Sequence, residues 1–146
     1  MATTEADRLR QFAITRRLEA AGFRAWPATS THYDGTWAVR LTTSFPAKRL
    51  NSVNPLDPSD DRDIEGRIAR ARAHFAAAGR ELIFRQSPLA PPALKAHLDA
   101  EGWESFGESV VFTADLATLD LSDALDRIPI RDAERYLDCL LYTSDA

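Results

Sequence analysis

Residues 47–61 read AKRLNSVNPLDPSDD, and this stretch decides the fold because it contains the second strand of a predicted pair and leads into a predicted helix. The segment before it, TWAVRLTTSF at residues 36–45, has the period-two pattern of a half-buried strand. In that pattern Trp37, Val39 and Leu41 alternate with Ala38, Arg40 and Thr42. We expect KRLNSVNPL, residues 48–56, to be the antiparallel partner, with a bulge between Leu50 and Val53.

The residues that follow the stretch have the period of an amphipathic helix over residues 60–78. Apolar side chains recur there at spacings of three and four, at Ile64, Ile68, Ala71, Phe75 and Ala78. Asp57 and Pro58 are typical of an N-cap and a first helical position, and Gly79 is typical of a helix end. We therefore expect this apolar seam to pack against the sheet.

The rest of the chain supplies four further elements. Good helix formers over residues 5–22 predict a helix ending at Gly22, and their two apolar faces indicate either a helix covered on two sides or two short helices. Residues 29–35, TSTHYDG, are expected to form a loop. The remaining predictions are a strand at 81–87, a helix at 91–102 and a strand at 108–116. The order indicates a mixed fold of the α/β (α+β) class.

Composition narrows the class of protein. The chain has 146 residues, of which 45% are hydrophobic and 27% charged, as expected for one soluble globular domain. The net charge is −4 and the basic residues are scattered, so we expect no nucleic-acid partner. No apolar run approaches the roughly 20 residues of a membrane span, and the first residues lack a signal-peptide core. We therefore expect a cytoplasmic protein with no membrane partner.

The last residues carry an unusual pattern. Cys139 to Ala146 can be back-translated to codons that resemble the transposon mosaic end joined to DNA fragments when sequencing libraries are made, and an Asp138 codon ending in C completes the match. A genuine terminus that spells the same peptide is the alternative. We expect the natural reading frame to be cut near Asp138. The expected organisation is a domain over 1–117, a linker or the start of a truncated second domain over 118–138, and an adapter-derived tail over 139–146.

Five segments, taken in order, resemble the GNAT superfamily of N-acetyltransferases. The closer likeness is to the N-terminal half of bacterial members built from two such parts. The segments span most of residues 25–116: AWPA at 25–28, DGTWAVR at 34–40, KRLNSVNPL at 48–56, IFRQSPLAPPAL at 83–94 and HLDAEGWESFGESVVFTADL at 97–116. The resemblance implies a GNAT-like acyl-CoA N-acyltransferase fold, in which helices flank a central, mostly antiparallel mixed sheet.

The resemblance also implies a cofactor, which this fragment is not expected to bind. Members of the superfamily hold the pyrophosphate of coenzyme A on a glycine-rich loop, of pattern Arg/Gln-x-x-Gly-x-Gly/Ala, at a helix N-terminus. Here no glycine lies between Gly35 and Gly66, and Pro55 and Pro58 remove two N–H donors. Four aspartates stand where the pyrophosphate would lie. Acetyl-CoA is thus expected in the intact enzyme and not in this fragment.

Candidate site residues remain in the same stretch. The predicted substrate-binding residues are Trp37, Arg40, Arg49, Asn51 and Ser52. The structural alternative is that Asn51 and Ser52 satisfy backbone groups at a bulge and that Arg49 pairs with an acidic neighbour. His32, His74 and His97 have no second ligand at metal spacing, so no metal site is predicted. No catalytic residue can be named from this sequence.

The resemblance implies a function for the intact protein. It would transfer acetyl from acetyl-CoA to an amine of a small molecule or peptide, with a backbone N–H polarising the thioester carbonyl. This fragment would be the N-terminal, non-catalytic part, and its partner the missing C-terminal catalytic half. The alternative, from another class, is a stand-alone degenerate acyltransferase fold that serves as a ligand-binding or pairing module.

Overall fold

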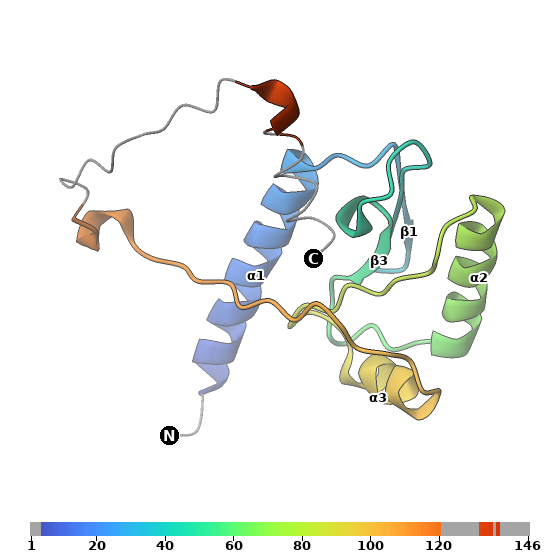
Figure 1. Cartoon of the computed structure of the whole chain (residues 1–146). Helices are drawn as coiled ribbons and strands as arrows, with labels where there is room; N and C mark the ends of the chain where they lie inside the picture. The colour runs from blue at the N-terminus through green and yellow to red at the C-terminus, as the bar shows by residue number, and fades with distance from the viewer. Residues whose placement is uncertain (1–3, 121–131, 136, 138–146) are drawn as a thin grey trace. The chain divides into compact units, whose positions relative to one another are not determined.

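Three antiparallel strands form the sheet of the computed structural model, which describes residues 4–120, 132–135 and 137. The strands are β1 (Ser30–Asp34), β2 (Trp37–Leu41) and β3 (Ser52–Pro55), in the order β1-β2-β3 (Figure 1). Thr31 lies opposite Arg40, and Arg40 lies opposite Ser52. Phe84 adds a single parallel bridge to Val53. The prediction of a mixed α+β fold is confirmed.

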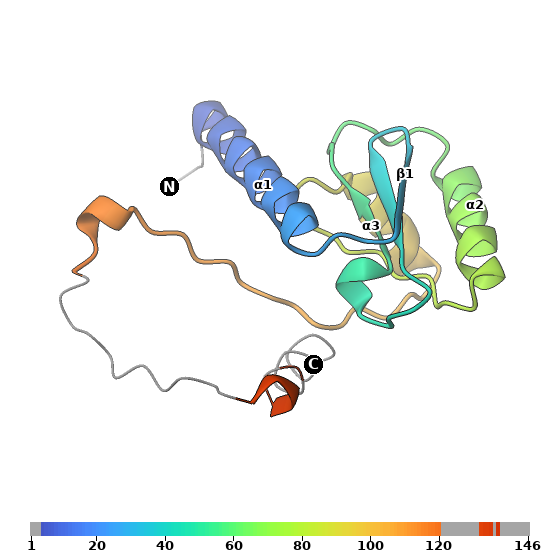
Figure 2. The same ribbon diagram turned by 90° about the horizontal axis from the view of Figure 1, so that it is seen from above.

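Within residues 4–120, three α-helices lie around these strands. They are α1 (Glu5–Ala25), α2 (Ile64–Ala77) and α3 (Pro92–Ala100), and the short 3-10 helices are η1 (Lys48–Leu50) and η2 (Leu116–Thr118). Figures 1 and 2 show α1 on one side of the strands and α2 on the other. The predicted proline start of α3 is confirmed.

The hydrophobic core lies between one face of the sheet and the helices α2 and α3. Its fully buried members are Trp37, Val39, Leu41, Val53, Ile68, Ala71, Phe75, Leu94 and Leu98. Ile64, Ala78, Leu82, Phe84 and Trp103 pack against them from the rim. The predicted seam of α2 is confirmed, because each of its residues belongs to one of these two sets.

The beginning of α2 differs from the prediction. The helix starts at Ile64, and its N-cap is Asp63, which adopts the left-handed conformation with φ 48°. Asp57 is not a cap: its Oδ1 accepts hydrogen bonds from Ser59 N at 2.9 Å and Ser59 Oγ at 2.7 Å. This side-chain turn holds Asp57 in the connection before the helix, because an aspartate can bond to backbone two residues on.

The predictions for β1 and β2 were wrong in part. Residues 30–34 form a strand and not a loop, and they carry no apolar alternation because four of the five are exposed. β2 is buried along its whole length and not half-buried, since β1 and β3 flank it and residues of α1 lie against its second face. A strand covered on both faces loses the polar-out signal that was expected.

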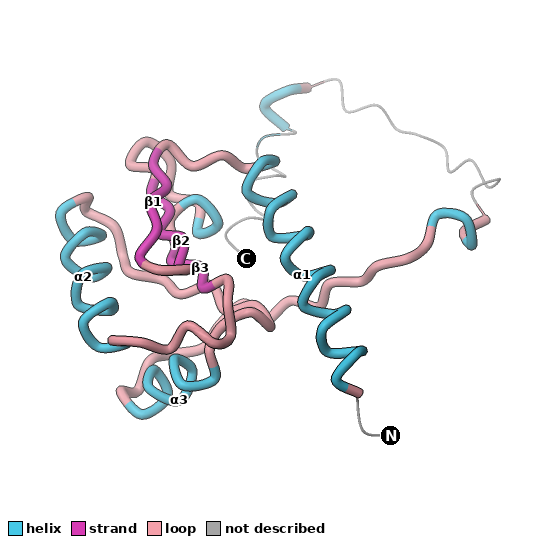
Figure 3. Tube along the Cα trace, turned by 180° about the vertical axis from the view of Figure 1, so that it is seen from behind, coloured by secondary structure: helices cyan, strands magenta, loops and turns pink. Residues whose placement is uncertain are grey.

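The other predicted strands are also altered. Residues 48–50 are the 3-10 helix η1, so β3 is shorter than predicted and needs no bulge. Residues 81–87 contribute only the bridge at Phe84. Residues 108–115 are not a strand, and Figure 3 draws this part of the chain as loop. Val110, Val111 and Phe112 are 73%, 69% and 89% exposed there.

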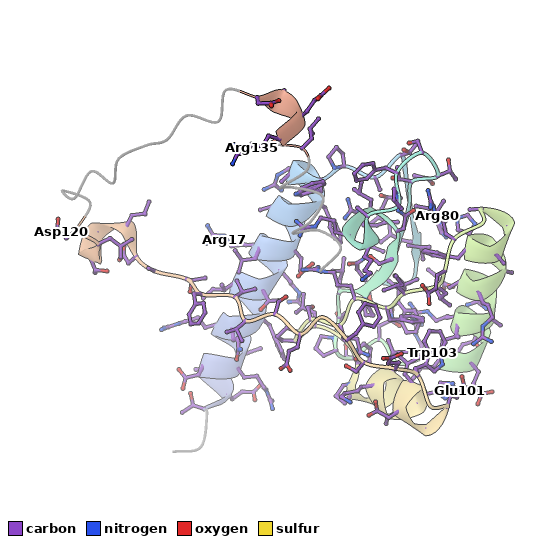
Figure 4. The ribbon with its side chains drawn as sticks, in the orientation of Figure 1. Arg17, Arg80, Glu101, Trp103, Asp120 and Arg135 are labelled. Atoms are coloured by element: carbon purple, nitrogen blue, oxygen red, sulfur yellow. The ribbon has the colours of Figure 1, made fainter. Side chains whose placement is uncertain are left out.

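Helix α1 is longer than predicted and is one continuous helix. It runs past Gly22 to Ala25, and Thr4 caps it with a reciprocal hydrogen bond pair to Asp7. It is not covered on two sides among the described residues, since only Glu19 is buried. Arg17, labelled in Figure 4, projects from the helix away from the strands.

The chain divides into two compact units, Met1–Trp103 and Glu104–Ala146. The sheet, the core and the helices α1, α2 and α3 belong to the first unit. The predicted adapter-derived tail, 139–146, and residues 121–131, 136 and 138 of the predicted linker lie outside the described residues. Within the described part of the chain, no helix has the length and apolar character needed to cross a membrane.

Candidate functional site

A pocket of about 360 Å³ lies between the edge strand β1 and helix α2. Figure 2 shows these two elements beside each other. The pocket is lined by His32, Tyr33, Asp34, Gly35, Trp37, Val39, Arg67, Arg70, Ala71 and His74. Its volume is within the range of small-ligand sites, and its lining combines apolar side chains with ionisable groups, as such sites commonly do.

Arg67 is a buried member of the pocket lining. Its side chain is 4% exposed, and its guanidinium lies 3.9 Å from the centroid of the Trp37 ring. Nη2 donates to Asp60 Oδ2 at 3.0 Å and also to the carbonyl oxygen of Asp34, while Nε is 3.4 Å from Asp34 Oδ1. Arg67 thereby joins α2 to the β1–β2 turn and to the connection before α2.

Asp60 is the buried counter-ion of Arg67. Its Oδ2 accepts hydrogen bonds from Thr36 N at 2.8 Å and from Thr36 Oγ1 at 2.7 Å. Burial alone would raise the pKa of Asp60, but the hydrogen bonds from Arg67 and Thr36 outweigh it and hold that pKa well below its usual range. The carboxylate is therefore ionised whenever the protein is folded near neutral pH.

Gly35 is required at the turn between β1 and β2 for two reasons. Its φ is +60°, a conformation in which side chains are strained. A Cβ at this position would also lie 2.6 Å from both Arg67 Nη2 and Asp60 Oδ2. The turn can approach the buried ion pair only because residue 35 has no side chain.

Two histidines and a second arginine form the rim of the pocket. The rings of His32 on β1 and His74 on α2 have centroids 4.7 Å apart and planes at 80°. Burial and the neighbouring His74 lower the pKa of His32, and Asp34 opposes them only in part. Arg70 is held by Asp34 Oδ2 and Asp63 Oδ2, each at 3.0 Å.

Sequence reasoning missed both members of the buried ion pair. Arg67 lies three residues after Ile64 and four before Ala71, so it falls on the apolar seam of α2, and this position was the available signal. Asp60 carried no comparable signal, because it is one of four aspartates in a short stretch. The proximity of His32 and His74 also required the fold.

The predicted site residues on the strands are largely buried. Trp37 is 1% exposed and belongs to the core, and its ring edge also contacts Phe84 at 5.8 Å between centroids. Arg40 is 3% exposed. Its guanidinium donates to Arg49 O at 2.8 Å and to Trp26 O. Burial is the main cause that lowers the pKa of Arg40.

Asn51 and Ser52 make hydrogen bonds of the structural kind. Asn51 Oδ1 accepts from Thr42 N at 2.8 Å, and its Nδ2 donates to Phe45 O at 2.8 Å and Ala47 O at 3.0 Å. Ser52 is fully buried, and its Oγ accepts from Asn54 Nδ2 at 3.2 Å. These contacts fit the structural alternative, and a substrate contact at these residues stays a prediction.

Arg49 is the exposed member of the predicted set. Its guanidinium lies 4.9 Å from the centroid of the Trp26 ring. It does not share the β1–α2 pocket with Trp37, the one predicted residue that lines it. The structure therefore does not bring the five predicted residues together into a single cavity.

The chemistry open to the pocket follows from these contacts. Arg67 and Arg70 are both already paired with carboxylates, so neither presents an uncompensated charge. The indole Nε1 of Trp37 is buried without a hydrogen-bond partner. Among the described residues, no group of three or more His, Cys, Asp or Glu side chains is placed to hold a metal ion. Besides Arg70, the exposed polar side chains of the lining are the imidazoles of His32 and His74 and the phenol of Tyr33.

The connection before α2 is rich in aspartates that are engaged in side-chain hydrogen bonds. Its aspartates hold Ser59, Thr36 and Arg67, and the helix begins at a left-handed Asp63. A phosphate site at a helix N-terminus needs open backbone N–H groups and no nearby anions.

No protein-family model, curated protein or solved structure matches this chain.

Proposed function

We propose that this chain is the N-terminal, non-catalytic part of a two-part N-acetyltransferase of the GNAT superfamily. One observation carries most of the proposal: Val53 of β3 and Phe84 are bridged in parallel, and α2 lies between them in the sequence. Antiparallel strands followed by a helix and a parallel strand are what the resemblance implies. The intact enzyme would use acetyl-CoA to acetylate an amine in the cytoplasm.

The parallel pairing of Val53 with Phe84 rests on main-chain hydrogen bonds. Val53 N donates to Ile83 O at 2.8 Å, and Arg85 N donates to Val53 O at 2.9 Å.

The connection before α2 supports the non-catalytic part of this proposal. The connection before the helix holds the Asp60–Arg67 pair where active members would hold a pyrophosphate. Acetyl-CoA binding and catalysis would then belong to the missing C-terminal half.

Calorimetric titration of the chain with acetyl-CoA tests the absence of a cofactor site. At tens of micromolar protein we expect no saturable heat, because a charged diphosphate would meet Asp57, Asp60 and Asp63 without a glycine-rich loop. A one-site isotherm would refute the proposal that this half is degenerate.

The natural reading frame beyond codon 138 tests the proposed partner. A frame that continues into a strand followed by a glycine-rich loop and a helix would support the two-part enzyme. The full-length protein should then transfer acetyl from acetyl-CoA to one or more amines, and this chain alone should not. A frame that stops without such a motif would favour the ligand-binding module, for which the β1–α2 pocket is the supporting observation.

A further inference from the structure

The β1–α2 pocket brings together two histidines that are far apart in the sequence. His32 lies on the edge strand and His74 on the third turn of α2, and both side chains are exposed. Their ring centroids are 4.7 Å apart. We propose that His32 and His74 bind one divalent transition-metal ion, of which Zn²⁺ is the representative, with the remaining coordination positions open to the pocket.

The separation of the rings matches a shared ion. With a zinc–nitrogen bond of about 2.0 Å, two imidazoles on one ion at tetrahedral or right angles have centroids about 4.5 to 5 Å apart. The observed 4.7 Å falls in this range. The edge-to-face orientation requires one ring to turn about χ2, a soft torsion for histidine, and exposure of both side chains leaves room for the turn.

The charges around the pair of histidines cancel. The ionised groups of this network are balanced, since Asp34, Asp60 and Asp63 form ion pairs with Arg62, Arg67 and Arg70. Metals bind the neutral form of imidazole. A small anion would find Arg67 and Arg70 already paired with carboxylates.

The ligand type predicts which ions bind. Imidazole nitrogen suits Zn²⁺, Ni²⁺ and Cu²⁺, whereas Mg²⁺ and Ca²⁺ prefer oxygen ligands. Two protein ligands leave at least two positions for water or for a ligand donor atom, since zinc is usually four-coordinate. The pocket volume of about 360 Å³ gives such a ligand room beside Val39 and Ala71.

The test is a calorimetric titration of the untagged chain with ZnCl₂. Cys139→Ser is the background for every sample, because a thiolate would otherwise compete for the ion. We expect one saturable site in the parent. In both His32→Ala and His74→Ala the affinity for Zn²⁺ should be at least about tenfold lower than in the parent. The matched control is His97→Ala, a histidine of α3 that lies 3.6 Å from Glu101 and does not line the pocket; its isotherm should equal the parent's.

Other outcomes overturn the proposal. An absence of saturable zinc binding in the parent would do so, as would His32→Ala and His74→Ala variants that bind like the parent. Equal binding of Mg²⁺ would show a diffuse acidic surface instead of an imidazole site. His32→Gln and His74→Gln provide a second pair of variants should an alanine variant lose its far-UV circular dichroism.

Discussion

Arg67 and Asp60 tie three separate parts of the chain to each other. Arg67 lies on α2, Asp60 lies in the connection before that helix, and Thr36 stands at the β1–β2 turn. Both charged side chains are less than 10% exposed. A buried ion pair contributes little net stability by itself, but removal of one partner leaves the other charge buried without compensation.

The first prediction is that Asp60→Asn strongly destabilises the protein. It removes the negative charge while keeping the side chain's shape, so Arg67 keeps a buried charge with only Asp34 nearby. We expect a loss of about 3–5 kcal/mol in the free energy of unfolding. Urea denaturation at neutral pH measures it. The control is the exposed neighbour Asp61→Asn, which should stay within about 0.5 kcal/mol of the parent. Equal losses of unfolding free energy in both variants would contradict the assignment of Asp60 as the buried counter-ion of Arg67.

The second prediction concerns the pH dependence of stability. An aspartate in an unfolded chain has a pKa of about 3.9, and the folded pKa of Asp60 is lower than this. Its stabilising contribution is therefore complete above the unfolded pKa and is lost as pH falls toward the folded pKa. From about pH 5 to pH 3 the parent should lose more free energy of unfolding than Asp60→Asn, which has no such proton to bind. If the free energy of unfolding fell with pH in parallel for the parent and Asp60→Asn, the lowered pKa of Asp60 would be contradicted.

At the scale of elements, α2 and β1 show what a sequence pattern can and cannot reveal. The seam of α2 was predictable because Ile68, Ala71 and Phe75 all face the core, so burial and period agree. β1 was missed because its side chains are exposed and carry no apolar alternation. The pocket between the two elements could not be predicted, since neither element contains it alone.

The strand prediction for residues 108–116 was wrong for the opposite reason. Its valines and phenylalanine have high strand propensity, yet residues 108–115 form no strand in the described structure. A strand exists only where a partner supplies backbone hydrogen bonds, and a single sequence does not state which partner is present. The same dependence on neighbours reduced residues 81–87 to one bridge at Phe84.

The third prediction tests the seam of α2. Ile68 is 4% exposed in the core, so Ile68→Ala removes buried methylene groups and leaves a partial cavity. We expect a loss of about 2–5 kcal/mol in the free energy of unfolding. The adjacent Ala69 is exposed, and Ala69→Gln should change stability by less than about 0.5 kcal/mol. Urea denaturation of the two variants compares them, and a larger effect at Ala69 would reverse the assigned face.

At the scale of the whole molecule, every residue of the core cluster and its rim lies in the first compact unit. The cluster extends from Trp37 on β2 to Leu98 on α3, and Trp103 closes the rim (Figure 4). The Nε1 of Trp103 donates to Glu101 Oε2 at 3.2 Å, and the Trp103 ring packs against Phe84 at 5.6 Å between centroids. A domain that contains its own core can fold without the rest of the chain.

The last prediction is that residues 1–104 fold as an independent domain. Truncation after Glu104 keeps the whole core, so the urea unfolding free energy should stay within about 0.5 kcal/mol of the full chain's value. The denaturant slope should fall only if the removed residues bury surface, because that slope follows the area exposed on unfolding. A fragment of residues 1–90 is the control. It lacks Leu94, Leu98 and Trp103, and the exposed core it leaves should abolish cooperative unfolding. If residues 1–104 also unfold without a cooperative transition, the remaining chain must supply packing that the core of the first unit lacks, and the boundary at Trp103 is wrong.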